Sequence, residues 1–283
     1  MAIRNRVSRK LQAIPLGGLI AVLAFVLSLR ADSPPTMVPV RFKEGLTHGF
    51  LVVSTLHGEI LGDGDLIQLV KADQVDNHLR YHFKDGSVHE ETSVFSQRRE
   101  FRLLNYHLLQ KGPSFKHPVE VWIDVAAGQV KVSATDKDGN AKVTTDQLKL
   151  PPDLANGLVL TLLKNVRSDG ALRLSMVAAT PKPRLVHLAI STMGEEAFSF
   201  ARSSRKALHY VVKVEIGGVA GLVAPLLGKE VPDTHVWILG GEAPTFVKSE
   251  GPLCMDCPVW RVELASPVWP ASPRHASSGE SGR

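Results

Sequence analysis

The sequence predicts a mainly β protein, in which an antiparallel meander forms a curved sheet or half-barrel with one covering helix, preceded by an N-terminal apolar leader helix. Three observations favour this fold class: apolar and polar residues alternate in many short runs, turn-forming residues separate those runs, and one segment after the leader has clear helical spacing. The chain has 283 residues, of which 44% are hydrophobic and 22% charged, so it can bury a substantial core.

Residues 1–31 are predicted to be a signal peptide or a signal anchor. A basic stretch precedes an uncharged run of 17 residues from Ala13 to Leu29, which is the order found in export signals. Leu29 is large where a cleavage site prefers a small residue, so an uncleaved anchor remains an alternative. Because the basic residues precede the run, the body is expected to be exported, either periplasmic or extracellular or tethered by the uncleaved anchor.

The net charge of +5 comes from the leader. The rest of the chain carries 28 basic and 28 acidic residues, so no basic surface for phosphate groups is expected. This balance argues against a nucleic-acid partner. The expected partners are a lipid or envelope proteins, with membrane contact through the N-terminal segment if it is uncleaved.

The domain limits follow from composition. Residues 32–39 contain three prolines and are read as an extended spacer, and residues 40–270 are read as the β-rich domain. Residues 271–283 have only alanine as an apolar residue, so a disordered tail is expected. The β-rich domain is predicted either as one sheet or as two sub-sheets divided near residues 150–166.

Four runs show the alternation of half-buried strands, in which neighbouring side chains face opposite ways. In the first run Leu79, Tyr81 and Phe83 share one face, and polar residues lie on the other. Turn-forming segments separate such runs, so consecutive strands are expected to pair antiparallel. The other apolar faces are Val119, Val121, Ile123 and Val125; Leu172, Leu174 and Met176; and Leu208, Tyr210, Val212, Val214 and Ile216, and the turns are 84–87, 127–128, 136–140 and 168–170.

The covering helix is predicted from Asp153 to Asn165. Leu154, Leu158 and Leu162 recur at helical spacing, and they are the residues predicted to line an apolar ligand. A second apolar segment, 217–230, is read either as a short helix or as a buried loop. A sheet with one apolar face needs such a cover.

Segments 79–115, 150–166 and 217–252 together resemble an exported bacterial β-rich family of unknown function. The meander with a single covering helix is also similar, in architecture only, to the half-barrel of periplasmic lipoprotein carriers such as LolA. These resemblances imply the fold and the exported location, and they bring no catalytic or ligand residues with them.

Cys254 and Cys257 are the only cysteines and form a CxxC motif between two prolines. A local disulfide, half of a metal site and a redox dithiol are the three interpretations of this pair, and the disulfide is favoured because the chain is expected to be exported. A tetrahedral metal site needs two further ligands, which the sequence does not indicate.

No other motif indicates chemistry. The chain has 11 histidines, which are expected to face solvent on strands, and the neighbouring Glu90 and Glu91 are expected on opposite faces of a strand, where each keeps the strand hydrated. No catalytic residue, cofactor or metal site is predicted. The leading hypothesis is an exported noncatalytic β protein of the cell envelope that binds a lipid or another apolar ligand. The alternatives are an envelope hydrolase whose site is not visible in the sequence and a structural or interaction protein of the envelope.

Overall fold

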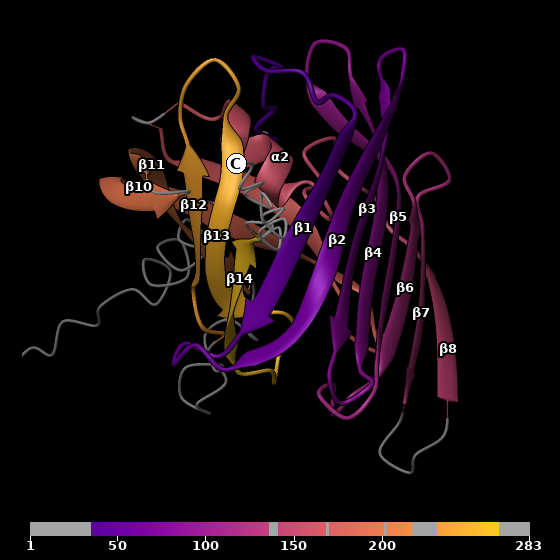
Figure 1. The fold of residues 1–283 in the computed structure, drawn as a ribbon. Coiled ribbons are helices and arrows are strands. Elements are labelled where there is room, and N and C mark those ends of the chain that lie inside the picture. The colour runs from indigo at the N-terminus through magenta and orange to yellow at the C-terminus, as the bar shows by residue number, and fades with distance from the viewer. Residues whose placement is uncertain (1–34, 136–140, 168–169, 201–202, 217–230, 266–283) are drawn as a thin grey trace, which may run out of the picture. The chain divides into compact units, whose positions relative to one another are not determined.

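The computed structural model of the protein describes residues 35–135, 141–167, 170–200, 203–216 and 231–265 (Figure 1). The predicted leader (1–31), the tail (271–283) and the apolar segment 217–230 lie outside these residues, as do the turns 136–140 and 168–169. Within the described residues, no helix has the length and apolar character that crossing a bilayer requires.

The described residues are mainly β, as the sequence predicts: they form fourteen strands and one short helix. All fourteen strands are hydrogen-bonded into one antiparallel sheet. The strands are β1 (Thr47–Ser54), β2 (Ile60–Lys71), β3 (Gln74–Phe83), β4 (Val88–Gln97), β5 (Phe101–Lys111), β6 (Val119–Asp124), β7 (Gln129–Thr135), β8 (Ala141–Gln147), β9 (Leu172–Ala178), β10 (Arg184–Phe200), β11 (Ser203–Glu215), β12 (Thr234–Leu239), β13 (Thr245–Pro252) and β14 (Val259–Leu264), and the helix is α2 (Val159–Asn165).

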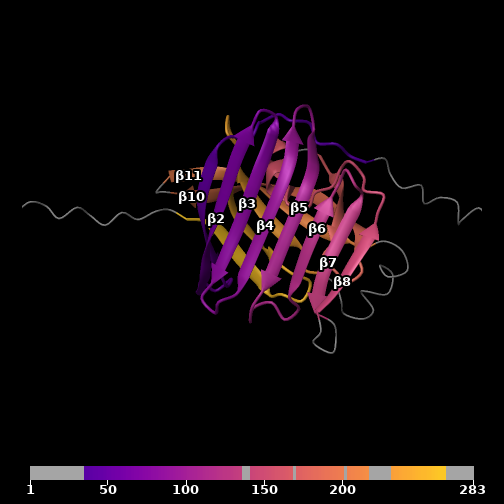
Figure 2. The same ribbon diagram turned by 90° about the vertical axis from the view of Figure 1, so that its right-hand side faces the viewer.

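The sheet consists of two meanders that meet in its middle. Strands β1 to β8 pair in chain order and form the first half, and strands β9 to β14 form the second half in the same way. Strand β1 pairs with β14, which joins the two halves. The two edge strands, β8 and β9, follow one another in the chain and are not hydrogen-bonded to each other, so the sheet is not closed. Figure 2 shows β2 to β8 side by side.

The predicted alternation is confirmed in β3 and β6. In β9 it holds only in part, because Ser175 and Val177 are buried and Met176 is half-buried. In β3 the side chains of Leu79, Tyr81 and Phe83 are buried, whereas His78 and His82 lie on the outer face. Val119, Val121 and Ile123 of β6 are buried in the same way. The two turns that the structure describes in full are also as expected, since Gly86 and Gly128 have positive φ angles of 84° and 64°.

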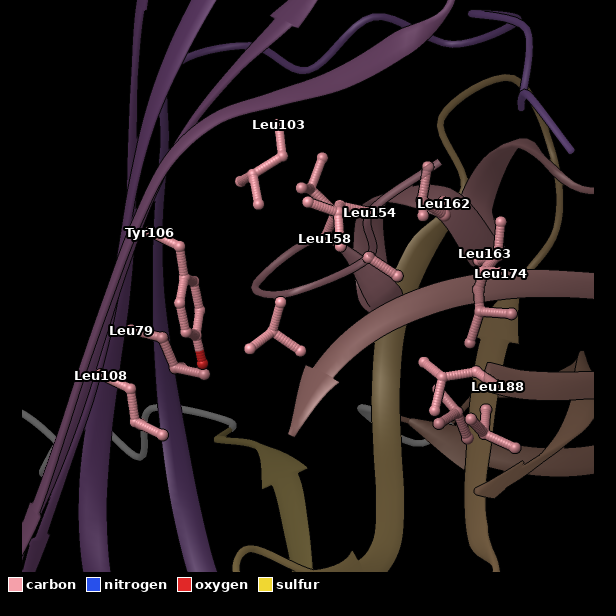
Figure 3. Close-up of a cluster of buried hydrophobic side chains, with 14 of the residues drawn as sticks. Leu79, Leu103, Tyr106, Leu108, Leu154, Leu158, Leu162, Leu163, Leu174 and Leu188 are labelled. Carbon is pink, nitrogen blue, oxygen red and sulfur yellow. The ribbon is translucent and has the colours of Figure 1, made fainter. Parts of the chain in front are cut away.

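One hydrophobic core takes side chains from both halves of the sheet and from the segment between them. Leu103 of β5, Leu174 of β9 and Leu158 belong to the same cluster of buried residues. Figure 3 shows Leu154 and Leu158 between Leu103 on one side and Leu174 on the other. The inner faces of the two halves therefore pack around the segment that connects β8 to β9.

The covering helix is shorter than the sequence predicts, because α2 begins at Val159 rather than near Asp153. The residues before it form turns on either side of Leu154, which forms a parallel bridge with Ser175 of β9. The Asn156 side chain donates to the backbone carbonyl of Val177 at 3.0 Å and accepts from the Val177 N–H at 2.9 Å. These bonds to β9 replace the first turns of the predicted helix.

The segment that precedes β1 closes the core at the end where α2 lies. Asn165, the last residue of α2, accepts hydrogen bonds from the backbone N–H groups of Arg41 and Phe42. Gln97 of β4 accepts from the Glu44 N–H at 2.7 Å and donates to the Glu44 carbonyl at 3.0 Å. This segment is therefore held by side chains in addition to an antiparallel bridge between Pro39 and Glu100.

Candidate functional site

The three leucines predicted to line an apolar ligand lie in the core between the inner faces of the two halves of the sheet. Leu154, Leu158 and Leu162 are 3%, 1% and 3% exposed. They come from the segment that covers the interior between the two halves, and they pack with Leu103 and Tyr106 of β5 in the same cluster. In this structure the three side chains contact other core residues.

The inner face of β4 is polar, although β4 runs through an apolar interior. Its inward positions are His89, Glu91, Ser93, Phe95 and Gln97, and four of these five carry a polar side chain. The expectation that histidines face solvent is therefore wrong for His89, which is 4% exposed. The prediction that Glu90 and Glu91 lie on opposite faces is correct, but Glu91 faces the interior rather than bulk solvent.

Glu91 lies among aromatic and imidazole groups. The hydroxyl of Tyr106 lies near its carboxylate, and His89 Nε2 lies 3.8 Å from Glu91 Oε2. Burial raises the pKa of Tyr106 and of Tyr81, and the negative charge of Glu91 raises both further. The Glu91 side chain is 19% exposed, so solvent reaches a carboxylate on the inner face of the sheet.

The loop before α2 lies directly on the next inward residue of β4. Ser93 Oγ donates to the carbonyl oxygen of Gly157 at 3.2 Å and accepts from Asn77 Nδ2 at 3.4 Å. Gly157 has a φ of +69°, and a Cβ at this position would lie 2.7 Å from the Ser93 Cβ. Only glycine fits this close approach of the cover to the sheet.

The second end of the interior is closed by the loop that holds the two cysteines. Cys254 and Cys257 form a disulfide with their Cα atoms 5.0 Å apart, and Cys257 is buried in the core. Gln110 of β5 donates to the Leu253 carbonyl at 2.6 Å and contacts His89 Nδ1 at 3.0 Å.

Across the described residues, no three side chains of the His, Cys, Asp and Glu types come together as a metal-binding set.

The outer face carries two ladders of the same composition. In the first, His107 of β5 stacks on Trp122 of β6 with a centroid distance of 5.2 Å, and Lys131 of β7 lies 4.5 Å from the Trp122 ring. His107 also contacts Glu120 at 2.8 Å. In both ladders each residue is the direct partner of the next in the strand register.

The second ladder consists of His209 of β11, Trp237 of β12 and Lys248 of β13, and it extends into a chain of hydrogen bonds. His209 Nδ1 lies 2.7 Å from Glu196 Oε1, and His209 Nε2 lies 2.8 Å from His235 Nδ1. The Trp237 indole N–H donates to Glu196 at 2.8 Å, and this bond together with that to His209 lowers the pKa of Glu196. His209 is 8% exposed, so it also departs from the solvent-facing expectation.

Two shallow hollows lie on the outer face in the described residues, with volumes of about 320 and 360 Å³. The first borders the His107 ladder and includes Asn105, Trp122 and Gln129. The second lies over β9 to β11 and includes Arg173 and Lys213.

No family model, curated protein or solved structure matches this chain. The sequence indicated an apolar cover segment and a disulfide between the two cysteines, but it did not indicate the polar group on β4. The signal that could have indicated this group is the alternation that places His89, Glu91 and Ser93 on the same face as the apolar Phe95.

Proposed function

We propose that this chain is an exported, noncatalytic protein of the cell envelope that binds a lipid or another apolar molecule between the two halves of its sheet. In this proposal the curved sheet acts as a half-barrel, and the segment 150–166 is its movable cover. Leu154, Leu158 and Leu162 of the cover would line the bound chain. The observation that carries the proposal is the Glu91 carboxylate, which lies on the inner face and is 19% exposed.

An inward carboxylate that solvent reaches indicates a way into the interior beside the cover. The cover crosses the gap between β8 and β9, where no strand pairing closes the sheet. It is tied to β4 through the Ser93–Gly157 hydrogen bond, at 3.2 Å. Two further bonds, between Asn156 and the Val177 backbone, hold the cover to β9. Breaking each bond costs about 0.5–1.5 kcal/mol, and each CH₂ group that a ligand buries returns about 0.8 kcal/mol.

The interior leucines must separate for a ligand to enter, because Leu158 is 1% exposed in this structure. An alkyl chain would then replace the contacts between the cover and β5 with contacts of the same kind. Apolar ligands bind best in sites that are apolar along most of their length and carry few polar groups. The group around Glu91 is the polar end of such a site.

The test is native mass spectrometry of the full chain, purified from the envelope fraction in a mild buffer. A mass increment of a lipid that organic extraction removes is the expected result, and the extracted protein should take up a fluorescent alkyl probe. Leu158→Trp fills the interior and should weaken probe binding, whereas Leu185→Trp, on the outer side of β10, should not. A chain that carries no lipid and takes up no probe would refute the proposal.

A second candidate function is hydrolysis of an envelope polymer at the outer face, and the Glu196–His209–His235 chain favours it. When His209 is neutral, its Nδ1–H donates to Glu196 and its Nε2 accepts from His235, which leaves His235 Nε2 as a base. The test is turnover of envelope polymers by the full chain. Activity that survives His235→Ala would exclude this site as its source.

A further inference from the structure

The interior contains hydrogen-bond acceptors for which the described residues provide no donor. Asn77 Oδ1 is buried and has no hydrogen-bond partner, and the residue is 6% exposed. Leaving such a group unpaired costs about 1–3 kcal/mol, so it is rare in a folded protein. The Asn77 amide nitrogen is already used, because it donates to Ser93.

Asn77 and Glu91 lie on the adjacent strands β3 and β4, one diagonal step apart in the register. In the register of β3 and β4, Asn77 is opposite Ser93, and Leu79 is opposite Glu91. Asn77 and Glu91 are therefore diagonal neighbours on the inner face, and such pairs lie about 7–8 Å apart at their Cα atoms. A single small group between them can reach both side chains.

The charge of Glu91 has no strong cation beside it. Its one ion-pair partner among the described residues is His89, at 3.8 Å, and His89 Nδ1 contacts Gln110. The other close donor is the neutral hydroxyl of Tyr106. A carboxylate in an apolar interior is stabilised most by a cation that also donates hydrogen bonds.

We propose that the molecule bound in the interior is an amphiphile with a primary ammonium head, which lies between Glu91 and Asn77. The ammonium donates hydrogen bonds to the Glu91 carboxylate and to Asn77 Oδ1, and its alkyl chain lies along Leu79, Leu103 and the cover. This inference rests on the proposed function and specifies its ligand class. A carboxylate head is excluded by repulsion from Glu91, and an alcohol head leaves the charge of Glu91 without compensation.

The experiment compares three single-chain amphiphiles of equal length: dodecylamine, dodecanol and dodecanoate. Each displaces a fluorescent alkyl probe from the full, lipid-extracted chain at neutral pH and below its micelle concentration. Dodecylamine should bind about tenfold or more tightly than dodecanol, and dodecanoate should bind most weakly. Equal binding of the three, or a preference for dodecanoate or dodecanol, overturns the ammonium head and leaves the proposed function intact.

The variants separate the head group from the apolar site. Glu91→Gln keeps the shape of the side chain and removes its charge, so it should abolish the preference for dodecylamine while dodecanol still binds. Glu90→Gln is the matched control, because Glu90 lies on the outer face and pairs with His78 and Arg80. A preference that survives Glu91→Gln in a folded protein overturns the inference, and failure of all three amphiphiles to bind the wild-type chain refutes the proposed function itself.

Discussion

Asn165 Oδ1 accepts a hydrogen bond from the backbone N–H of Phe42 at 2.7 Å, although 123 residues separate the two. The same oxygen accepts from the Arg41 N–H at 2.8 Å, and the Asn165 amide donates to the Thr161 carbonyl at 3.0 Å. One buried side chain thus ends α2 and fixes the chain that leads into the sheet.

Asn165→Ala should destabilise the protein by about 1–3 kcal/mol, because it leaves two backbone N–H groups without their acceptor. Urea unfolding followed by circular dichroism measures the change. Asn105→Ala, at an exposed position of β5, is the control and should change the free energy of unfolding by less than about 0.5 kcal/mol. Equal effects of the two substitutions would contradict the role assigned to Asn165.

Gly157→Ala should lower the free energy of unfolding by more than the strain of a positive φ alone explains. Gly86 has a φ of +84° and open space around its Cα, whereas a Cβ on Gly157 would lie 2.7 Å from Ser93 Cβ. Gly86→Ala therefore measures the backbone strain, about 1–2 kcal/mol, and the excess for Gly157→Ala measures the contact of the cover with β4. Hydrogen exchange should show the excess as faster exchange in 153–158, and equal losses of stability would show that the cover does not press on Ser93.

The disulfide should contribute little through chain entropy. For so short a loop the entropic contribution is about 2 kcal/mol, below that of a long-range bond. Cys257 is buried in the core, whereas Cys254 is partly exposed, so Cys254→Ser should cost less than Cys257→Ser even though each breaks the same bond. Thermal unfolding measures the two variants. Equal losses would assign the whole effect to the bond, and loss of bound zinc from the wild type would favour a metal site instead.

Glu196 should make stability depend on pH in the acid range. Its pKa is lowered by the Trp237 hydrogen bond and then by that of His209, so the stabilisation is fully present above the usual pKa of glutamate and is lost as the pH falls through the lowered value. The difference in unfolding free energy between wild type and Glu196→Gln should therefore shrink on acidification. Trp237→Phe, which removes the indole donor, should weaken this pH dependence. The same dependence in Trp237→Phe and wild type would contradict the assignment.

The sheet was predictable from the sequence where burial alone decides the pattern. Leu79, Tyr81 and Phe83 alternate with polar residues because one face of β3 is in the core, and the chain shows that period directly. The start of α2 was not predictable in the same way. Asn156 bonds to the backbone of Val177, and no local pattern reveals a partner on another strand.

The polar group of the interior was hidden for a related reason. Glu91 looks like a solvated residue of a strand, since its neighbours in sequence are polar on both sides. Its position inside the core follows from the register with Leu79 on β3 and from the Tyr106 hydroxyl on β5. Both are contacts between strands, so within the sequence of β4 the one signal is the alternation that places Glu91 on the same face as Phe95.

The pairing of Leu51 with Leu264 sets the order in which the sheet can assemble. Each meander grows from neighbouring hairpins, but the seam between β1 and β14 joins the first described strand to the last and pairs the strands that are farthest apart in sequence. A nascent chain therefore displays β1 as an unprotected edge until β14 has been synthesised. A polypeptide that stops short of Val259 should aggregate through that edge, at the strand that forms the middle of the finished sheet.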